Sequence, residues 1–133
     1  DSHAPLVLDS QIEWLSAQLQ QLSDQRIIVA LHHPLIETGV KWIDQRMRVQ
    51  NGQQIHAQLV QYSKQLQGVF HGHIHQPVNS YCDGVLYVGT PSTWYNLQAY
   101  PDLQDDETDL LMPGGFNLVM IRDNRTFIRR YVL

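Results

Sequence analysis

Apolar residues near the start of the chain recur every three or four positions, a spacing typical of a half-buried helix. The pattern predicts a helix over residues 8–23. Asp9 or Ser10 is a suitable N-cap, and Glu13 follows Ser10 by three positions, as in a capping box. The apolar side of this helix comprises Ile12, Leu15, Leu19 and Leu22.

An unbroken apolar run follows, "RIIVALH" at residues 26–32, and it predicts a strand covered on both faces, as in a parallel or mixed sheet. Pro34 ends this strand, and residues 35–49 are predicted to form a loop. Residues 53–66 return to helical spacing and predict a second amphipathic helix. Its apolar side comprises Ile55, Leu59, Tyr62 and Leu66.

Extended patterns dominate the rest of the chain. A short strand is predicted for "GVFHG" at residues 68–72. Two alternating runs within residues 78–89 meet at Asp83-Gly84, a dipeptide typical of a two-residue hairpin turn. The last residues, 116–133, predict another hairpin.

This last hairpin is predicted to turn at Asp123-Asn124. Before it, residues 90–115 form a long acidic segment, and loops of this length are usually functional or disordered. The order of elements is helix, strand, helix, strand and then strands only. It predicts an α/β fold with helices on one face of a mixed sheet and antiparallel hairpins in a second sheet.

Composition narrows the possible partners and compartments. The 133 residues fit one domain, and a hydrophobic content of 43% supports a core. A net charge of −4 without a basic stripe argues against nucleic acid, and no apolar run approaches the roughly 20 residues that span a bilayer. The single cysteine, Cys82, fits a reducing or redox-indifferent compartment, and no signal peptide is evident, so a cytoplasmic location is expected.

Three of the seven histidines lie within "FHGHIHQ" at residues 70–76. Residues two apart in an extended segment point to the same side, so His71, His73 and His75 are expected to share a face. Gly72 would let the backbone approach whatever these side chains face.

A second pair of histidines, His32 and His33, follows the first predicted strand. In open α/β sheets, ligands bind just beyond the carboxyl ends of the strands, and His73 and His75 also follow a strand. Neutral imidazole is the commonest side-chain metal ligand. The two strand ends therefore predict one shared metal site.

The spacing of the cluster favours two metals over one. Cα atoms two apart in a strand are roughly 6.5–7 Å apart, which suits metals about 3.5–4 Å from each other better than one compact tetrahedral ion. Such a site needs carboxylates, and neither histidine motif has one beside it. His3, near the chain start, and His56, on the expected polar side of the second helix, are interpreted as ordinary structural residues.

The motifs "HHP" at residues 32–34 and "GHIH" at residues 72–75 resemble the last two of five metal-binding blocks in the calcineurin-like metallophosphoesterases. The resemblance implies three earlier blocks, of the forms DxH, GDxxD and GNH[DE], and none occurs in this sequence. The chain thus resembles the C-terminal half of such a domain. Its α/β fold would be half of an αββα sandwich, with residues 1–133 as a single-domain fragment that starts without Met.

Longer segments narrow the resemblance to the bacterial class III 3',5'-cyclic AMP phosphodiesterases. They are "HHPLIETGVKWIDQ" at 32–45, "GHIHQ" at 72–76 and "GTPSTW" at 89–94. The resemblance implies a hydrolase that uses two divalent metal ions, of the Fe, Mn or Zn type, on a small cyclic nucleotide. The intact protein is expected to be an active phosphodiesterase, whereas these residues alone are expected to bind metal weakly and to be inactive.

Carried over position by position, the resemblance implies that His32 and His73 bind one metal and that His75 binds the other. His33 is expected beside the ligands or the substrate. No role follows for His71. The family's leaving-group histidine belongs to an upstream block, so no catalytic residue is assigned in this chain.

Two interpretations remain for each residue that could contact the substrate. Trp42 either covers a nucleobase or packs a long loop. Thr90, with Ser92 and Thr93, either lines the mouth of the site or forms a small polar turn. The acidic run at 105–109 is interpreted as a solvated loop.

Other functions fit the same residues. A related enzyme would hydrolyse a glycerophosphodiester or a phosphomonoester. A one-metal zinc hydrolase would use His32, His73 and His75 alone, and a non-catalytic module would use them only for structure. Missing upstream strands would leave a sheet edge uncovered, so the fragment is expected to self-associate.

Overall fold

The structure, a computed structural model, describes residues 4–133, so the interpretation of His3 lies outside it. Within these residues no helix is both long and apolar enough to cross a membrane. The elements in chain order are α1 Asp9–Gln21, β1 Ile27–Leu31, α2 Lys41–Arg46, α3 Gly52–Val60, β2 Leu66–His71, β3 Asn79–Cys82, β4 Val85–Gly89, β5 Asn96–Leu97, β6 Thr108–Asp109, β7 Gly115–Arg122 and β8 Arg125–Val132.

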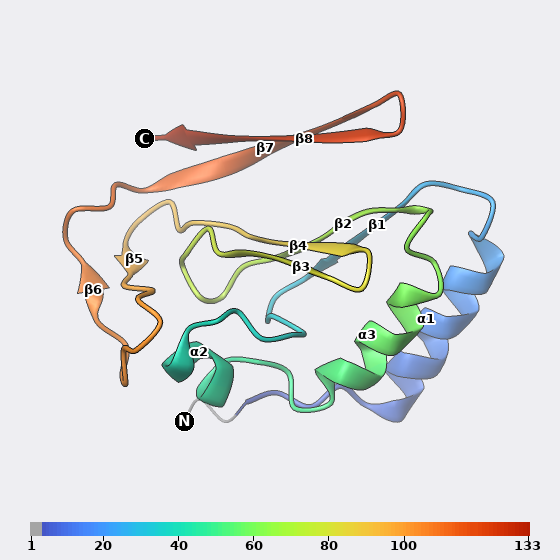
Figure 1. The fold of residues 1–133 in the computed structure, drawn as a ribbon, viewed down its shortest axis with the longest axis horizontal. Coiled ribbons are helices and arrows are strands. Elements are labelled where there is room, and N and C mark those ends of the chain that lie inside the picture. Colours follow the sequence, from blue (N-terminus) through green and yellow to red (C-terminus); the bar gives the residue numbers. More distant parts are fainter. Residues whose placement is uncertain (1–3) are drawn as a thin grey trace.

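A four-stranded mixed sheet with the order β1-β2-β4-β3 forms the centre of the molecule. β1, β2 and β4 run parallel, and β3 is antiparallel to β4. Helices α1 and α3 lie on one side of this sheet, and the β7–β8 hairpin lies on the other (Figure 1). The predicted α/β class, with helices on one face of a mixed sheet, is confirmed. Of the two predicted hairpins, only β7–β8 forms a separate sheet, whereas the β3–β4 hairpin belongs to the mixed sheet because β4 pairs with β2.

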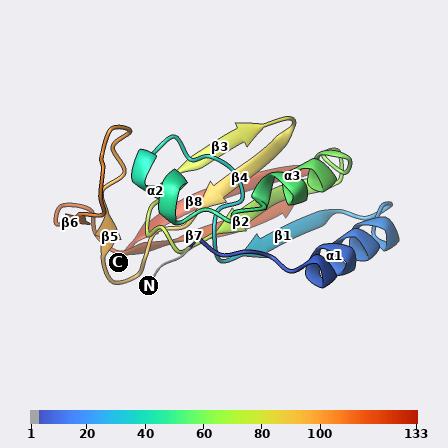
Figure 2. The ribbon, with the colours of Figure 1, turned by 90° about the horizontal axis from the view of Figure 1, so that it is seen from below.

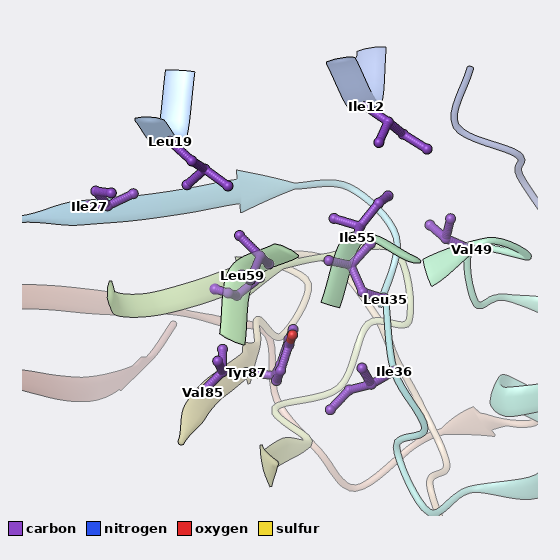
Figure 3. Packing of buried hydrophobic residues seen from close by; sticks show 11 residues of the cluster. Ile12, Leu19, Ile27, Leu35, Ile36, Val49, Ile55, Leu59, Val85 and Tyr87 are labelled. Atoms are coloured by element: carbon purple, nitrogen blue, oxygen red, sulfur yellow. The ribbon is translucent and has the colours of Figure 1, made fainter. Parts of the chain in front are cut away.

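The main core fills the space between the two long helices and the sheet (Figure 3). Leu19 of α1 and Leu59 of α3 are buried there, together with Tyr87 of β4. Burying one such apolar side chain contributes roughly 1.5–3 kcal/mol. The predicted apolar sides of both helices face this core: Ile12, Leu19, Ile55 and Leu59 are buried, and Leu15, Leu22, Tyr62 and Leu66 are partly buried.

The ends of the helices differ from the prediction. Leu8 is the N-cap of α1, and its N–H donates to Oε1 of Gln11 at 3.0 Å, so neither Asp9 nor Ser10 is the N-cap. α3 ends at Val60, because the chain turns there to enter β2.

His56 of α3 was expected on a polar helix face, and this expectation was wrong. Its side chain is buried, with 5% of its surface exposed, and it contacts Tyr87 and Asp83. The sequence pattern did not indicate this position, because the partners come from the β3–β4 hairpin, far along the chain.

β1 is covered on one face only, which corrects the expectation of a strand buried on both faces. Ile27 is buried, whereas Ile28 has 51% of its surface exposed. β1 is the edge strand of the described sheet, and the hydrogen bonds from the β7–β8 hairpin reach β2 and the end of β4 instead.

The predicted loop at 35–49 contains α2, and this helix belongs to a second, smaller core. Trp42 and Ile43 of α2 pack there with Ile74 of the "GHIH" motif, and all three are fully buried. The segment at 90–115 also holds a short hairpin, β5–β6. These elements lie at the end of the sheet where the histidine motifs emerge.

Candidate metal centre

The two histidine motifs lie side by side at the carboxyl end of the sheet. Because β1, β2 and β4 are parallel, their chains leave the sheet at one edge, near α2 and β5–β6 (Figure 2). His32 directly follows β1, and its carbonyl accepts a hydrogen bond from the Gly72 N–H at 3.1 Å. Thr90, which directly follows β4, donates from its N–H to the His71 carbonyl at 2.9 Å. The backbone therefore joins all three strand ends.

Three imidazoles converge at this edge. Nδ1 of His73 lies 3.1 Å from Nε2 of His32, and the ring centroids of His33 and His73 are 3.8 Å apart. Each of the three residues offers a nitrogen within 4.8 Å of the other two. Metal–nitrogen bonds of about 2.0–2.1 Å at angles of roughly 90–110° place two ligand nitrogens about 2.8–3.4 Å apart. The observed pair of nitrogens fits this range.

His33 lies within the group of convergent imidazoles, together with His32 and His73. Its Nδ1 lies 3.1 Å from the Met47 carbonyl. Because a carbonyl only accepts hydrogen bonds, Nδ1 carries the proton and Nε2 keeps its lone pair. Metal-binding histidines are commonly oriented in this way by a backbone carbonyl. Met47, whose Sδ also lies 3.0 Å from Nε2 of His73, was not foreseen, because nothing in the sequence links it to either motif.

The alternation expected for His71, His73 and His75 does not occur. β2 ends at His71, whose side chain is buried, and the two later histidines have positive φ values of 63° and 49°. A left-handed conformation costs a non-glycine residue roughly 1–2 kcal/mol. Strain of this kind is typical of sites where geometry serves a function. The space above Gly72 is open, because a Cβ added there would meet only Nδ1 of His32, at 4.0 Å.

His75 stands apart from the three-imidazole group. Its ring packs against Tyr95, with centroids 4.7 Å apart, and its Nδ1 is buried without a hydrogen-bond partner among residues 4–133. A buried polar atom without a partner costs about 1–3 kcal/mol. An additional ligand, such as a metal ion, would satisfy this nitrogen. Tyr95 was not predicted, although it directly follows the "GTPSTW" segment.

Burial and neighbouring imidazoles lower the pKa of two histidines at this edge of the sheet. The pKa of His73 is lowered to about 4 by burial and by the neighbouring His33, His32 and His75. Burial also lowers the pKa of His71. Metal ligation requires neutral imidazole, so His73 is held at neutral pH in the form that binds a cation.

Trp42 and Asp44, both in α2 after the "HHP" motif, make contacts within the protein. Trp42 is fully buried and donates from Nε1 to the Gln98 carbonyl at 3.3 Å, which favours the packing interpretation over contact with a nucleobase. Asp44 accepts from the Thr38 N–H at 2.7 Å and orders the loop. In the described part of the chain, no carboxylate joins the group of His32, His33 and His73.

No protein-family model matches the chain. It is, however, 38% identical over 88 residues to a 3',5'-cyclic-nucleotide phosphodiesterase of Nostoc sp.. It is 31% and 27% identical, over 122 and 113 residues, to the 3',5'-cyclic adenosine monophosphate phosphodiesterases CpdA of Haemophilus influenzae and Escherichia coli. The chain is a homologue of these bacterial phosphodiesterases. The resemblance seen in the two histidine motifs is thereby confirmed.

These similarities cover 66%, 90% and 85% of this chain. The chain in turn spans 32%, 43% and 40% of the length of these three phosphodiesterases. More than half of each of these relatives therefore lies outside the matched region.

Proposed function

We propose that this chain supplies the histidine ligands of a two-metal centre in a phosphodiesterase. The proposed substrate of this enzyme is a 3',5'-cyclic nucleotide, namely cAMP. The observation that carries the proposal is the convergence of His32, His33 and His73 at one sheet edge, within 4.8 Å of one another. The names of the homologous proteins support the reaction and the substrate class. The strained backbone at His73 and its lowered pKa support a reactive site better than a purely structural role.

The residues divide between two positions. His32 and His73 would hold one divalent ion, with His33 oriented toward the same ion by the Met47 carbonyl. His75 would hold the other ion, which would supply a partner for the buried ring nitrogen that has none among residues 4–133. Two such ions, when bound, lower the pKa of a water molecule and neutralise charge on the phosphoryl oxygens. Thr90 remains a candidate for substrate contact at the mouth.

The carboxylate ligands are proposed to come from residues outside this chain. The larger part of each relative that lies outside the matched region supports this, as does the lack of a carboxylate at the imidazole group of residues 4–133. Residues 1–133 would then be the C-terminal part of an αββα metallophosphoesterase domain of a cytoplasmic enzyme. The exposed edge strand β1 favours self-association of the isolated chain.

One observation favours a second candidate, a zinc hydrolase with a single metal. The three convergent imidazoles suffice for one zinc ion with an open fourth position. This candidate needs no residue outside the chain. It differs from the prediction made from the sequence, because His33 takes the place of His75.

Metal content and activity separate the two candidates. The isolated chain and the full-length protein would be loaded with Mn²⁺ or Zn²⁺ and assayed on cAMP, a glycerophosphodiester, a phosphomonoester and bis-(p-nitrophenyl) phosphate. We expect two metals and cAMP hydrolysis for the full-length protein and negligible turnover for the isolated chain. Robust hydrolysis by the isolated chain with one bound zinc would overturn the two-metal proposal. Light scattering of the isolated chain would test self-association, and a clean monomer would contradict it.

A further inference from the structure

A second cluster of metal-ligating atoms lies at the opposite end of β4 from the histidine motifs. His56 projects from α3, while Cys82 and Asp83 come from the β3–β4 hairpin. β4 runs from Val85 to Gly89, which is about 13 Å at roughly 3.3 Å per residue. The two clusters therefore cannot share an ion.

The three donor atoms form a triangle of suitable size for one tetrahedral ion. Nε2 of His56 lies 3.1 Å from Oδ2 of Asp83, and Sγ of Cys82 lies 3.7 Å and 3.5 Å from these two atoms. Zinc bonds of about 2.3 Å to sulfur and about 2.0–2.1 Å to nitrogen or oxygen give edges of roughly 3.5 Å and 3.3 Å. All three distances agree to within about 0.3 Å of these edges.

His56 is held in a ligand orientation by its other nitrogen. Its side chain is buried, and Nδ1 lies 2.7 Å from the Tyr87 hydroxyl, which is itself in the main core. A tyrosine hydroxyl either donates or accepts. When it accepts from Nδ1–H, the lone pair of Nε2 is free for a cation. Such a partner on the second nitrogen is typical of metal-binding histidines.

The hairpin turn holds the other two ligands. Asp83 and Gly84 both have positive φ, 49° and 83°, as in the two-residue turns that Asp-Gly favours. This turn places Sγ of Cys82 and Oδ2 of Asp83 on the same side, facing His56. Asp83 is exposed, so water reaches the fourth position of an ion bound there.

The charges of the cluster suit a divalent cation. The hydrogen bonds from His56 and Cys82 lower the pKa of Asp83, so its carboxylate is ionised. Desolvation and the nearby carboxylate raise the pKa of the Cys82 thiol, an effect that a bound cation would offset. Mg²⁺ and Ca²⁺ prefer oxygen ligands, whereas a mixed sulfur, nitrogen and oxygen set suits zinc.

We propose that His56, Cys82 and Asp83 bind one zinc ion through Nε2, Sγ and Oδ2, with water as the fourth ligand. Binding releases the thiol proton to solvent. The neutral imidazole moves its own proton from Nε2 to Nδ1, where it is donated to Tyr87. The ion would tie α3 to the β3–β4 hairpin, independently of the histidine motifs and of the proposed phosphodiesterase activity.

Cobalt(II) provides a direct test, because Cys82 is the only cysteine of the chain. Cobalt bound at this site produces a thiolate-to-metal charge-transfer band in the near ultraviolet, and cobalt bound to the other histidines does not. We expect the intensity of this band to correspond to one thiolate-bound cobalt per chain at saturation, and we expect excess zinc to displace it. Absence of the band at saturating cobalt would overturn the proposal, whatever the activity of the protein.

Matched variants separate this site from the other cluster. Cys82→Ser and His56→Gln should abolish the band, whereas His73→Asn should leave it unchanged. In the wild-type chain, zinc should slow alkylation of Cys82 by iodoacetamide at least about tenfold, because the zinc ion would hold the sulfur lone pair with which a free thiolate attacks the reagent. Equal alkylation rates with and without zinc would show that these residues form a hydrogen-bonded network only. Loss of the band in His73→Asn, with its circular dichroism unchanged, would likewise contradict the assignment.

Discussion

The two clusters of metal-ligating residues in this molecule differ in how many of their polar atoms have hydrogen-bond partners. At the carboxyl ends of the strands, three imidazoles crowd together on left-handed or loop backbone, and His75 keeps a buried nitrogen without a partner in the described chain. At the β3–β4 turn, both ring nitrogens of His56 have hydrogen-bond partners. Strain and an unsatisfied atom at the first cluster favour a reactive site, whereas the second cluster also stabilises the fold without an ion.

The largest effect is expected from Trp42→Ala. Removing this fully buried ring from the core that supports the "GHIH" motif should lower the free energy of unfolding by about 3–5 kcal/mol. Urea denaturation measures the change, and Trp94→Ala, which removes an exposed ring, is the matched control. If Trp42→Ala leaves the protein stable but raises the KM of the full-length protein for cAMP, the result would instead favour contact between Trp42 and the nucleobase.

Next in size is the effect of His73→Asn on the full-length protein. Losing a metal ligand should lower kcat/KM for cAMP by about 100-fold or more and reduce the metal content measured by mass spectrometry. His71→Gln is the control, since it alters a neighbouring buried histidine outside the imidazole group. Near-normal activity and metal content of a folded His73→Asn protein would remove His73 from the centre.

Tyr87→Phe tests the cluster that contains His56. Without the hydroxyl, Nδ1 of His56 loses its partner inside the core, which should cost about 1–3 kcal/mol in chelator-treated protein. Tyr81→Phe removes a hydroxyl from an exposed side chain and should change the free energy of unfolding by less than about 0.5 kcal/mol. Similar stability of the two variants would mean that the His56 network does not stabilise the fold.

The smallest effect is expected in the pH dependence of stability, which should differ between His73 and Asp83. Folding lowers the pKa of His73 from 6.5 to about 4, so between these values the unfolded chain binds more protons than the folded one. Stability of metal-free protein should therefore fall as the pH is lowered from 6.5 toward 4. Asp83, whose pKa lies below 3.8 in the fold, should lose its contribution only at still lower pH.

Urea denaturation at several pH values measures this dependence. His73→Asn should flatten the fall between pH 6.5 and 4, and Asp83→Asn should leave that range unchanged. An unaltered pH dependence in His73→Asn would show that its imidazole does not account for the loss of stability.

Local patterns predicted the parts of the fold that depend on neighbouring residues. The Asp83-Gly84 turn, the Asp123-Asn124 turn and the apolar sides of the helices all appear as expected, because turn chemistry and helical spacing act over a few residues. Predictions failed where contacts with a segment distant in sequence determine burial or the end of a helix. His56 is buried because β4 and the hairpin turn cover it, and α3 ends early because the chain enters β2.

The candidate site shows the same division. The residue pattern was enough to predict that "HHP" and "GHIH" each follow a strand, and these motifs also indicated the relationship to the cyclic nucleotide phosphodiesterases. The tertiary structure alone decided that His33 joins His32 and His73 while His75 turns toward Tyr95. Spacing along a chain fixes which residues are near a strand end, but side-chain direction depends on backbone φ values and on packing from segments far away in sequence.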